Sequence, residues 1–221
     1  MEVLYEDNHI IAVNKKSGDL VQGDKTGDTA LPEKIKDYLR KKYNKPGNIF
    51  CGVIHRLDRP VSGLVLFAKT SKALSRMNEL FRNKTIQKTY WAIVENPPQN
   101  KSGKLEHYLI KSVKTNKSQA FIKPYERALF SVLHYKTLKK LNRYTLLEVN
   151  PITGRHHQIR VQLSRSNSII KGDLKYGAKR SNKDSSICLH AREINFIHPV
   201  SKDPIKIIAP VPKNNIWEAC N

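Results

Sequence analysis

The chain has 221 residues, 39% of them hydrophobic, and its 40 lysines and arginines outnumber 19 aspartates and glutamates to give a formal charge of +21. Its apolar residues occur in distinct runs, which exclude a wholly disordered chain and fall short of the roughly 20 residues that span a bilayer. Such a charge indicates a polyanionic partner, most often nucleic acid, although a lysine-rich composition bias would give the same count.

Apolar periodicity predicts alternating strands and helices in the first half of the chain. Leu31, Ile35 and Leu39 recur at four-residue spacing and predict a helix over 30–43, capped by Asp28 or Thr29. A second helix has its apolar face at 74–81 and Thr70 or Ser71 as its cap. The strands expected around these helices span 3–5, 10–14, 49–54, 63–69 and 86–94.

Strands dominate the second half. They are predicted at 104–111, 119–123, 128–139, 144–150, 187–197 and 204–208, with one short helix at about 157–164. No repeat, linker or composition break divides the chain. We therefore expect an α+β fold, with a mixed, largely antiparallel sheet flanked by helices in a single domain over 1–221.

The stretch HRLDRPVSG (55–63) places one carboxylate, Asp58, between Arg56 and Arg59 in a loop that joins two predicted strands. Flanking positive charge favours the ionised carboxylate, which suits a nucleophile or a proton acceptor. It equally suits an ordinary surface ion pair. Because loops held by rigid strands often carry catalytic groups, Asp58 is a candidate catalytic residue.

A second polar stretch, NPITGRHHQIR (150–160), ends a strand and opens a helix. Three- and four-residue spacing places His157, Arg160 and Ser164 on one face of that helix. Together with Arg155 and His156, the cluster suits phosphates or pairing with a buried carboxylate. The alternative is a solvated basic helix.

A third stretch, KGDLKYG (171–177), has a glycine near each end. Such glycines indicate a turn in which backbone segments approach closely. Ordinary turn chemistry and a functional role explain it equally well.

These segments occur in the order and spacing of a known family. The chain resembles the RluA-type pseudouridine synthases in HRLDRPVSGLVLFAKT (55–70), KTYWAIV (88–94), LLEVNPITGRHHQIRVQLS (146–164), KGDLKYGA (171–178) and LHAREINFIHP (189–199). NKKSGDLVQGD (14–24) is similar to the family's first segment, so the resemblance covers nearly the whole chain. The HRLD and TGRxHQIR segments are highly specific together and only suggestive alone.

The resemblance implies an enzyme that isomerises uridine to pseudouridine in a tRNA or rRNA stem-loop, without metal or organic cofactor. It implies a mixed sheet crossed by an RNA-binding cleft. Asp58 matches the catalytic aspartate, Tyr90 the tyrosine that stacks near the target base, and Arg160 the arginine that pairs with the aspartate. Arg56 matches the arginine that takes the place of the flipped uridine.

The residues themselves suit this chemistry. Breaking a C–N glycosidic bond and rejoining it as C–C needs a carboxylate, a dry pocket and a held base, but no redox centre. Arg59, Arg155 and His157 are further candidates for RNA binding. We expect the catalytic domain to begin at the first residues, without a separate N-terminal RNA-binding module, so that the basic surface of the domain itself must hold the RNA.

The sequence also departs from the family pattern. Val61 stands where threonine is usual, Lys16 where proline is usual and His156 where threonine is common. The loss of the loop hydroxyl at position 61 leaves Asp58 in place and alters only the packing of the loop.

Two other functions compete with this interpretation. A non-catalytic RNA-binding protein would explain the charge, but it would not need an acid within the basic HRLD loop. A metal-dependent nuclease could use His55, Asp58, His156 and His157, but no HxH, HExxH or paired-carboxylate spacing supports a metal site.

Three widely separated cysteines, Cys51, Cys188 and Cys220, form no paired motif and indicate a reducing compartment. The N-terminus has no signal-peptide pattern. We expect a cytoplasmic monomer. The sequence leaves open which uridine is modified, and whether Asp58 attacks C1′ of the ribose or acts as a base at C2′.

Overall fold

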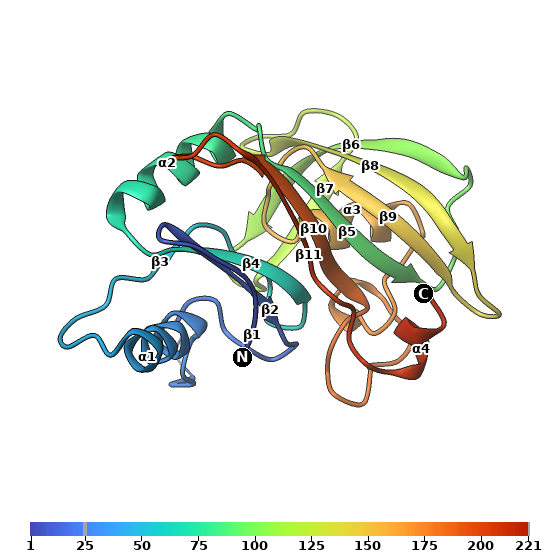
Figure 1. Ribbon diagram of the computed structural model, residues 1–221. Helices are drawn as coiled ribbons and strands as arrows, with labels where there is room; N and C mark the ends of the chain where they lie inside the picture. Colours follow the sequence, from blue (N-terminus) through green and yellow to red (C-terminus); the bar gives the residue numbers. More distant parts are fainter. Residues whose placement is uncertain (24–25, 221) are drawn as a thin grey trace. The chain divides into compact units, whose positions relative to one another are not determined.

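The computed structural model describes residues 1–23 and 26–220. Contacts along the chain divide it into two compact units. The first unit comprises Met1–Gln87 and Ala191–Pro212, and the second comprises Lys88–His190 and the chain from Lys213 onward. Each unit has its own set of strands (Figure 1).

The strands of the first unit are neighbours in the order β1, β2, β4 and β10, with β3 beside β4 and β11 beside β10. Their bounds are Glu2–Glu6 (β1), Ile10–Lys15 (β2), Gly52–Val53 (β3), Ser62–Ala68 (β4), Leu189–Ile197 (β10) and Pro204–Ile208 (β11). The registers of β1 with β2, β2 with β4, β3 with β4 and β10 with β11 are all antiparallel. At Gly63 a positive φ and the close backbone of Ala191 leave no room for a side chain.

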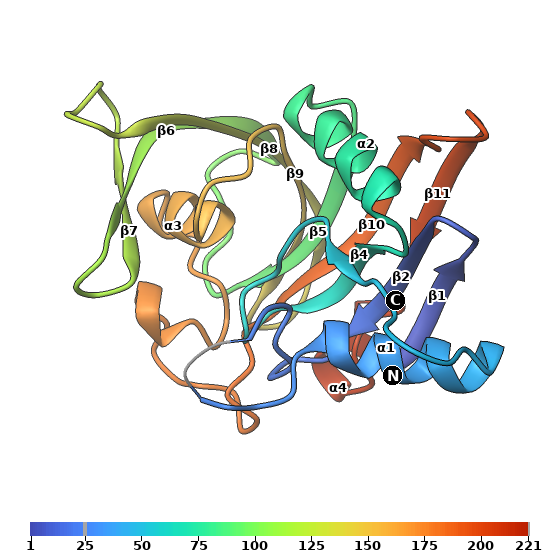
Figure 2. The same cartoon turned by 90° about the vertical axis from the view of Figure 1, so that its left-hand side faces the viewer.

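Two helices of this unit cover opposite faces of its sheet (Figure 2). Ile11 and Val13 pack with the apolar residues of α1 (Leu31–Tyr43), whereas Ile10 and Ala12 pack with those of α2 (Ser71–Arg82). Successive side chains of a strand point to opposite faces, so one apolar strand serves two cores.

The helix caps follow the prediction in one helix and contradict it in the other. Thr70 caps α2, and its side chain accepts a hydrogen bond from Ala73 N at 3.1 Å. The cap of α1 is Ala30, which has no side-chain hydrogen bond, so the prediction of Asp28 or Thr29 as the cap is wrong. Asp28 instead forms an ion pair with Arg59.

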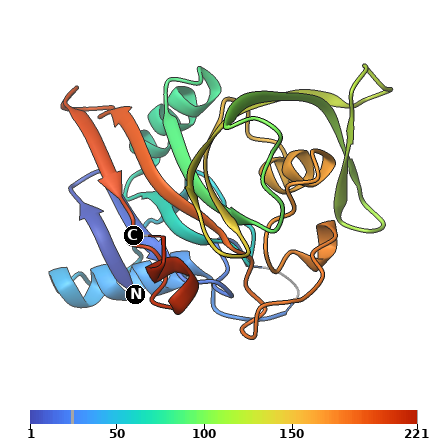
Figure 3. The same ribbon diagram turned by 90° about the vertical axis from the view of Figure 1, so that its right-hand side faces the viewer.

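The second unit contains the strands β5, β9, β8, β6 and β7 in that spatial order. Their bounds are Gln87–Val94 (β5), Ser102–Ser112 (β6), Lys117–Phe121 (β7), Leu129–Lys140 (β8) and Thr145–Pro151 (β9). All the neighbouring pairs are antiparallel. Figure 3 shows these strands, in green and yellow, curving around the orange helix α3 (Gln158–Arg165).

Buried amide side chains fix α3 to the strands. Gln162, which is fully buried, donates from Nε2 to the carbonyl oxygens of Leu105 at 3.0 Å and Ser131 at 3.3 Å. Gln158 donates to the carbonyl oxygen of Val132 at 3.0 Å. Because buried polar groups are costly unless they are paired, these bonds define one rotational position of the helix. That position determines where Arg160 points.

The structure confirms the predicted α+β class, with a largely antiparallel sheet flanked by helices, whereas a single domain over 1–221 stays a prediction. The strand expected over 49–54 is reduced to the two residues of β3. Two short elements were not predicted, the 3-10 helix η1 (Leu174–Tyr176) and the helix α4 (Asn215–Glu218). No helix in the described part of the chain is long and apolar enough to cross a membrane.

Candidate active site

The loop that carries Asp58 is fastened to the end of β2 by a buried lysine. Lys15 is only 1% exposed, and its Nζ donates to the carbonyl oxygens of Lys16, Arg59 and Val61 at 3.1, 3.0 and 2.6 Å. A further bond runs from Gly18 N to Arg59 O at 2.9 Å. The backbone that follows Asp58 is therefore held in one position, and the half-buried carboxylate is held with it.

Burying an ammonium group disfavours its charged form. Burial lowers the pKa of the Lys15 ammonium to about 8, while the charges of Asp19 and Asp58 act to raise it and that of Arg59 to lower it. Lys15 therefore still carries a proton at neutral pH, and its positive charge lies beside the loop of Asp58.

The two arginines of the HRLD loop are both exposed and have different partners. Arg56 donates from Nη1 to Gln22 Oε1 at 2.8 Å, whereas Arg59 forms an ion pair with Asp28 at 2.6 Å. The pair with Asp28 ties the loop to the segment that precedes α1. Exposed guanidinium groups suit contacts with phosphate. The assignment of both arginines to RNA binding stays a prediction.

His55 contacts the backbone of β4 and a ring of α2. Its Nε2 accepts a hydrogen bond from Leu66 N at 3.1 Å, and its ring stacks on Phe81 with 5.1 Å between the centroids. Within the described ranges 1–23 and 26–220, no group of three or more His, Cys, Asp or Glu side chains is arranged to hold a metal ion.

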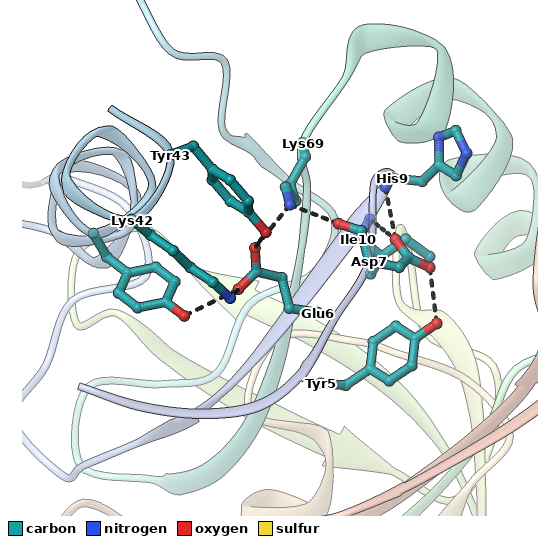
Figure 4. A network of polar contacts seen from close by, with 9 residues as sticks. Tyr5, Glu6, Asp7, His9, Ile10, Lys42, Tyr43 and Lys69 are labelled. Carbon is teal, nitrogen blue, oxygen red and sulfur yellow. Dashed lines mark hydrogen bonds and ion pairs between the residues drawn. The ribbon is translucent and has the colours of Figure 1, made fainter. Parts of the chain in front are cut away.

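A second polar cluster of the first unit fastens α1 to β1 (Figure 4). The carboxylate of Glu6 accepts hydrogen bonds from Lys42, Tyr43, Lys69 and Tyr38 at 2.7, 2.6, 2.9 and 3.0 Å. Burial acts to raise the pKa of Glu6, but these four donors lower it to about 2. None of these four donors to Glu6 is a residue to which the sequence assigned a catalytic role.

In the second unit, Arg160 forms a buried bidentate ion pair with Asp173. Its Nε donates to Asp173 Oδ2 at 2.7 Å and its Nη2 to Oδ1 at 2.8 Å, and the side chains are 5% and 1% exposed. The expectation that this stretch could pair with a buried carboxylate is confirmed. The predicted ion pair of Arg160 with Asp58 stays a prediction, because the two residues belong to different units.

His157, Arg160 and Ser164 all contact Tyr176, which confirms that they share one face. His157 Nδ1 and Tyr176 Oη are hydrogen-bonded at 2.8 Å, Ser164 Oγ donates to the carbonyl oxygen of Tyr176 at 2.8 Å, and the Arg160 guanidinium lies 5.1 Å from the ring centroid. His157 was predicted within the helix but caps it instead, with a left-handed backbone at φ 53°.

The other candidates of this unit occupy separate positions. His156 stacks on His157 with 3.8 Å between the ring centroids, and its Nδ1 lies 2.9 Å from Ser118 Oγ. Arg155 is exposed in the turn that precedes α3 and its cap. Tyr90 lies half-buried on β5, opposite Val149 of β9. The assignment of Tyr90 to base stacking stays a prediction.

Sequence reasoning missed three residues, Lys15, Asp173 and Tyr176. The signals for Lys15 were its position directly after an apolar run and its place in NKKSGDLVQGD (14–24), the segment similar to the family's first. Asp173 and Tyr176 lie in the third stretch, for which a turn and a functional role were left equally open and no residue was given a role. An acid and a tyrosine between two glycines could have been weighed as partners for the arginine of the second stretch.

Residues 9–165 match the family described as RNA pseudouridylate synthase. Over 216 residues the chain is 34% identical to the ribosomal large subunit pseudouridine synthase C of Buchnera aphidicola subsp. Baizongia pistaciae, which covers 95% of the chain and 66% of that relative. It is 30% identical to the tRNA pseudouridine synthase C of Pectobacterium carotovorum, covering 95% of the chain and 58% of the relative.

The chain thus spans about two thirds or less of the length of these curated relatives. Among solved structures, human RNA pseudouridylate synthase domain containing 4 aligns with a TM-score of 0.83 at 22% identity, covering 99% of this chain and 92% of that one. This likeness bears on the fold alone. The match over 9–165 contains both the HRLD loop and the α3 arginine, and the chain belongs to the RluA-type branch of the RNA pseudouridylate synthase family.

Proposed function

We propose that the chain is an RNA pseudouridine synthase that isomerises uridine in tRNA or rRNA, with Asp58 as its catalytic carboxylate. The observation that carries the proposal is the HRLD loop, in which a buried ammonium holds the backbone next to a half-buried carboxylate. A pure RNA-binding protein has no use for a fixed acid within a basic surface. The relatives are named for ribosomal RNA and for tRNA, so both are substrates to test.

The reaction exchanges one bond of the base for another. The C1′–N1 bond of uridine breaks, the base turns, and a C1′–C5 bond forms, while C5 loses its proton and N1 gains one. No electrons are transferred to an outside group. An ionised Asp58 supplies either a nucleophile at C1′ or a base at C2′.

The other residues would present the nucleotide to Asp58. Extruding a base costs a few kcal/mol, which stacking and filling of the vacated space can offset. We assign Tyr90 to stacking on the flipped base, Arg56 to the vacated space and Arg160 to an ion pair with Asp58. Arg59, Arg155 and His157 are assigned to the RNA backbone, where the charge of +21 supplies the general attraction.

The test replaces Asp58 by asparagine, which keeps the size of the side chain and removes the charge. Tritium release from RNA labelled at C5 of uridine, with pseudouridine mapped by chemical labelling and primer extension, should show product for the wild type only. RNA affinity should stay equal or rise slightly, because one repulsive charge is lost. The matched control, Asp37→Asn, removes an exposed helix carboxylate that pairs with Arg40 and should leave turnover unchanged.

Three outcomes separate the alternatives. RNA binding without product from the wild type, on the tRNA and rRNA of the source cell, would indicate a binding protein. Turnover of a short stem-loop could be lost in EDTA and restored by zinc or magnesium, and that result would favour a metal-dependent enzyme. Product from a folded Asp58→Asn protein would remove Asp58 from its role. Pseudouridine maps with and without the gene would name the target uridine.

The proposal includes a monomeric enzyme of the cytoplasm. Cys51, Cys188 and Cys220 are free thiols, which suits a reducing compartment. Mass measurement in solution and cell fractionation test these two assignments.

A further inference from the structure

We propose that Asp173 and Tyr176 are positioning residues that fix the guanidinium of Arg160 for the isomerisation. This inference rests on the proposed function and gives a role to the KGDLKYG stretch. Neither residue is expected to touch the RNA, and both act through Arg160.

The first support is the geometry of the pair. A carboxylate that accepts from both Nε and Nη2 fixes the plane of the guanidinium as well as its position. Both side chains are almost fully buried, so water does not compete for these bonds. Removing one partner of such a pair leaves an uncompensated buried charge, so the pair behaves as a unit.

The second support is the rigidity of Asp173 itself. Its N donates to Ile170 O at 3.0 Å, and its carbonyl oxygen accepts from Tyr176 N and Ala178 N, each at 3.0 Å. Gly172, immediately before it, has a φ of 86°, and a Cβ there would lie 2.8 Å from Ser186 O. The turn therefore needs glycine at this position, and it aims the carboxylate at one place on α3.

The third support is the set of contacts around Tyr176. Its hydroxyl accepts from Ser118 N of β7 at 2.8 Å and is hydrogen-bonded to His157 at 2.8 Å, while its ring faces the Arg160 guanidinium. One side chain thus connects an edge strand, the cap of α3 and the arginine. A turn that served only to reverse the chain would need none of these contacts.

The main variant is Asp173→Asn. The matched control is Asp184→Asn, because Asp184 is exposed and its carboxylate accepts hydrogen bonds from the backbone N and the hydroxyl of Ser186, two residues away. Under single turnover, Asp173→Asn should lower the rate by roughly 100-fold, the scale of a misplaced catalytic group, with an RNA dissociation constant within about twofold of wild type. Asp184→Asn should leave both quantities unchanged.

Two conservative variants guard against a protein that fails to fold. Asp173→Glu keeps the charge and should recover part of the rate lost in Asp173→Asn. Tyr176→Phe keeps the ring over Arg160 but loses the hydroxyl and its two hydrogen bonds. It should slow turnover by roughly 5- to 30-fold, which is the scale of one to two net hydrogen bonds. Circular dichroism and the thermal midpoint establish that each variant is folded.

A double-mutant cycle decides whether Asp173 acts through Arg160. Arg160→Lys removes the planar fork, so adding Asp173→Asn to it should slow turnover by less than about threefold. A further loss of the same size as in the wild-type background would overturn the inference, and so would an unchanged rate in the folded single variants. Either result leaves the proposed function standing, whereas a wild type without product would remove the proposed function itself.

Discussion

The buried lysine behind the HRLD loop predicts an unusual dependence of stability on pH. Lys15→Met keeps the length and apolar body of the side chain but removes its ammonium. The lowered pKa of about 8, against an ordinary value of 10.5, corresponds to a cost of about 3 kcal/mol for keeping the proton in the folded state. The variant escapes this cost, but it removes one donor from each of three carbonyl oxygens. Arg59 O keeps the bond from Gly18 N and Lys16 O keeps the bond from Asp19 N, whereas a carbonyl left dry and unpaired would cost about 1–3 kcal/mol.

The sign follows from proton binding. Between pH 8 and 10.5 the unfolded chain keeps the Lys15 proton and the folded chain has released it, so the free energy of unfolding rises with pH. Below pH 8 both states are protonated and the full cost is present. From pH 7 to pH 10 the wild type should therefore gain about 2–3 kcal/mol relative to Lys15→Met.

Urea unfolding of both proteins at pH 7, 8, 9 and 10 measures this difference, because the other lysines and tyrosines titrate in both and largely cancel. Lys206→Met serves as the control, since that side chain is 60% exposed, and its difference from wild type should vary little with pH. A stability difference between Lys15→Met and wild type that is flat over this range would refute the account of a buried, proton-bearing lysine. The same variant should slow turnover, because two of the three carbonyls belong to the loop of Asp58.

Two further predictions concern the charges of the surface and of the first unit. Glu6→Gln should lower the free energy of unfolding by about 1–3 kcal/mol at pH 6. Because the pKa of Glu6 is lowered to about 2, this difference from wild type should shrink as the pH falls from 4.5 toward 2. Urea unfolding at pH 6 and pH 3 measures it, and an equal difference at both pH values would contradict the prediction. RNA binding should weaken with salt, and the plot of log K against log salt concentration should fall with a slope of about −0.7 to −0.9 for each phosphate neutralised. A nearly flat salt dependence in filter binding would argue against a basic surface that follows the RNA backbone.

The sequence by itself determined the local structure. The four-residue spacing of Leu31, Ile35 and Leu39 places three apolar side chains on one face of a helix, and that face is the one α1 buries. The apolar run at the start of Ile10–Lys15 likewise indicates a strand, and the structure buries both of its faces. These signals are readable because helix and strand periods depend only on neighbouring residues. The HRLD and TGRxHQIR segments indicated the family by their resemblance to its motifs.

Only the tertiary structure decided which side chains became partners. Lys15 donates hydrogen bonds to carbonyl oxygens 44 and 46 residues away, and Asp173 forms its ion pair with Arg160, which lies 13 residues earlier. Such pairings depend on strand register and on the rotation of α3, which the buried amide of Gln162 sets through its bonds to β6 and β8. A lysine or an aspartate has the same local signal whether it is solvated or buried. Burial of these two charges therefore follows from the packing around them, which no local pattern encodes.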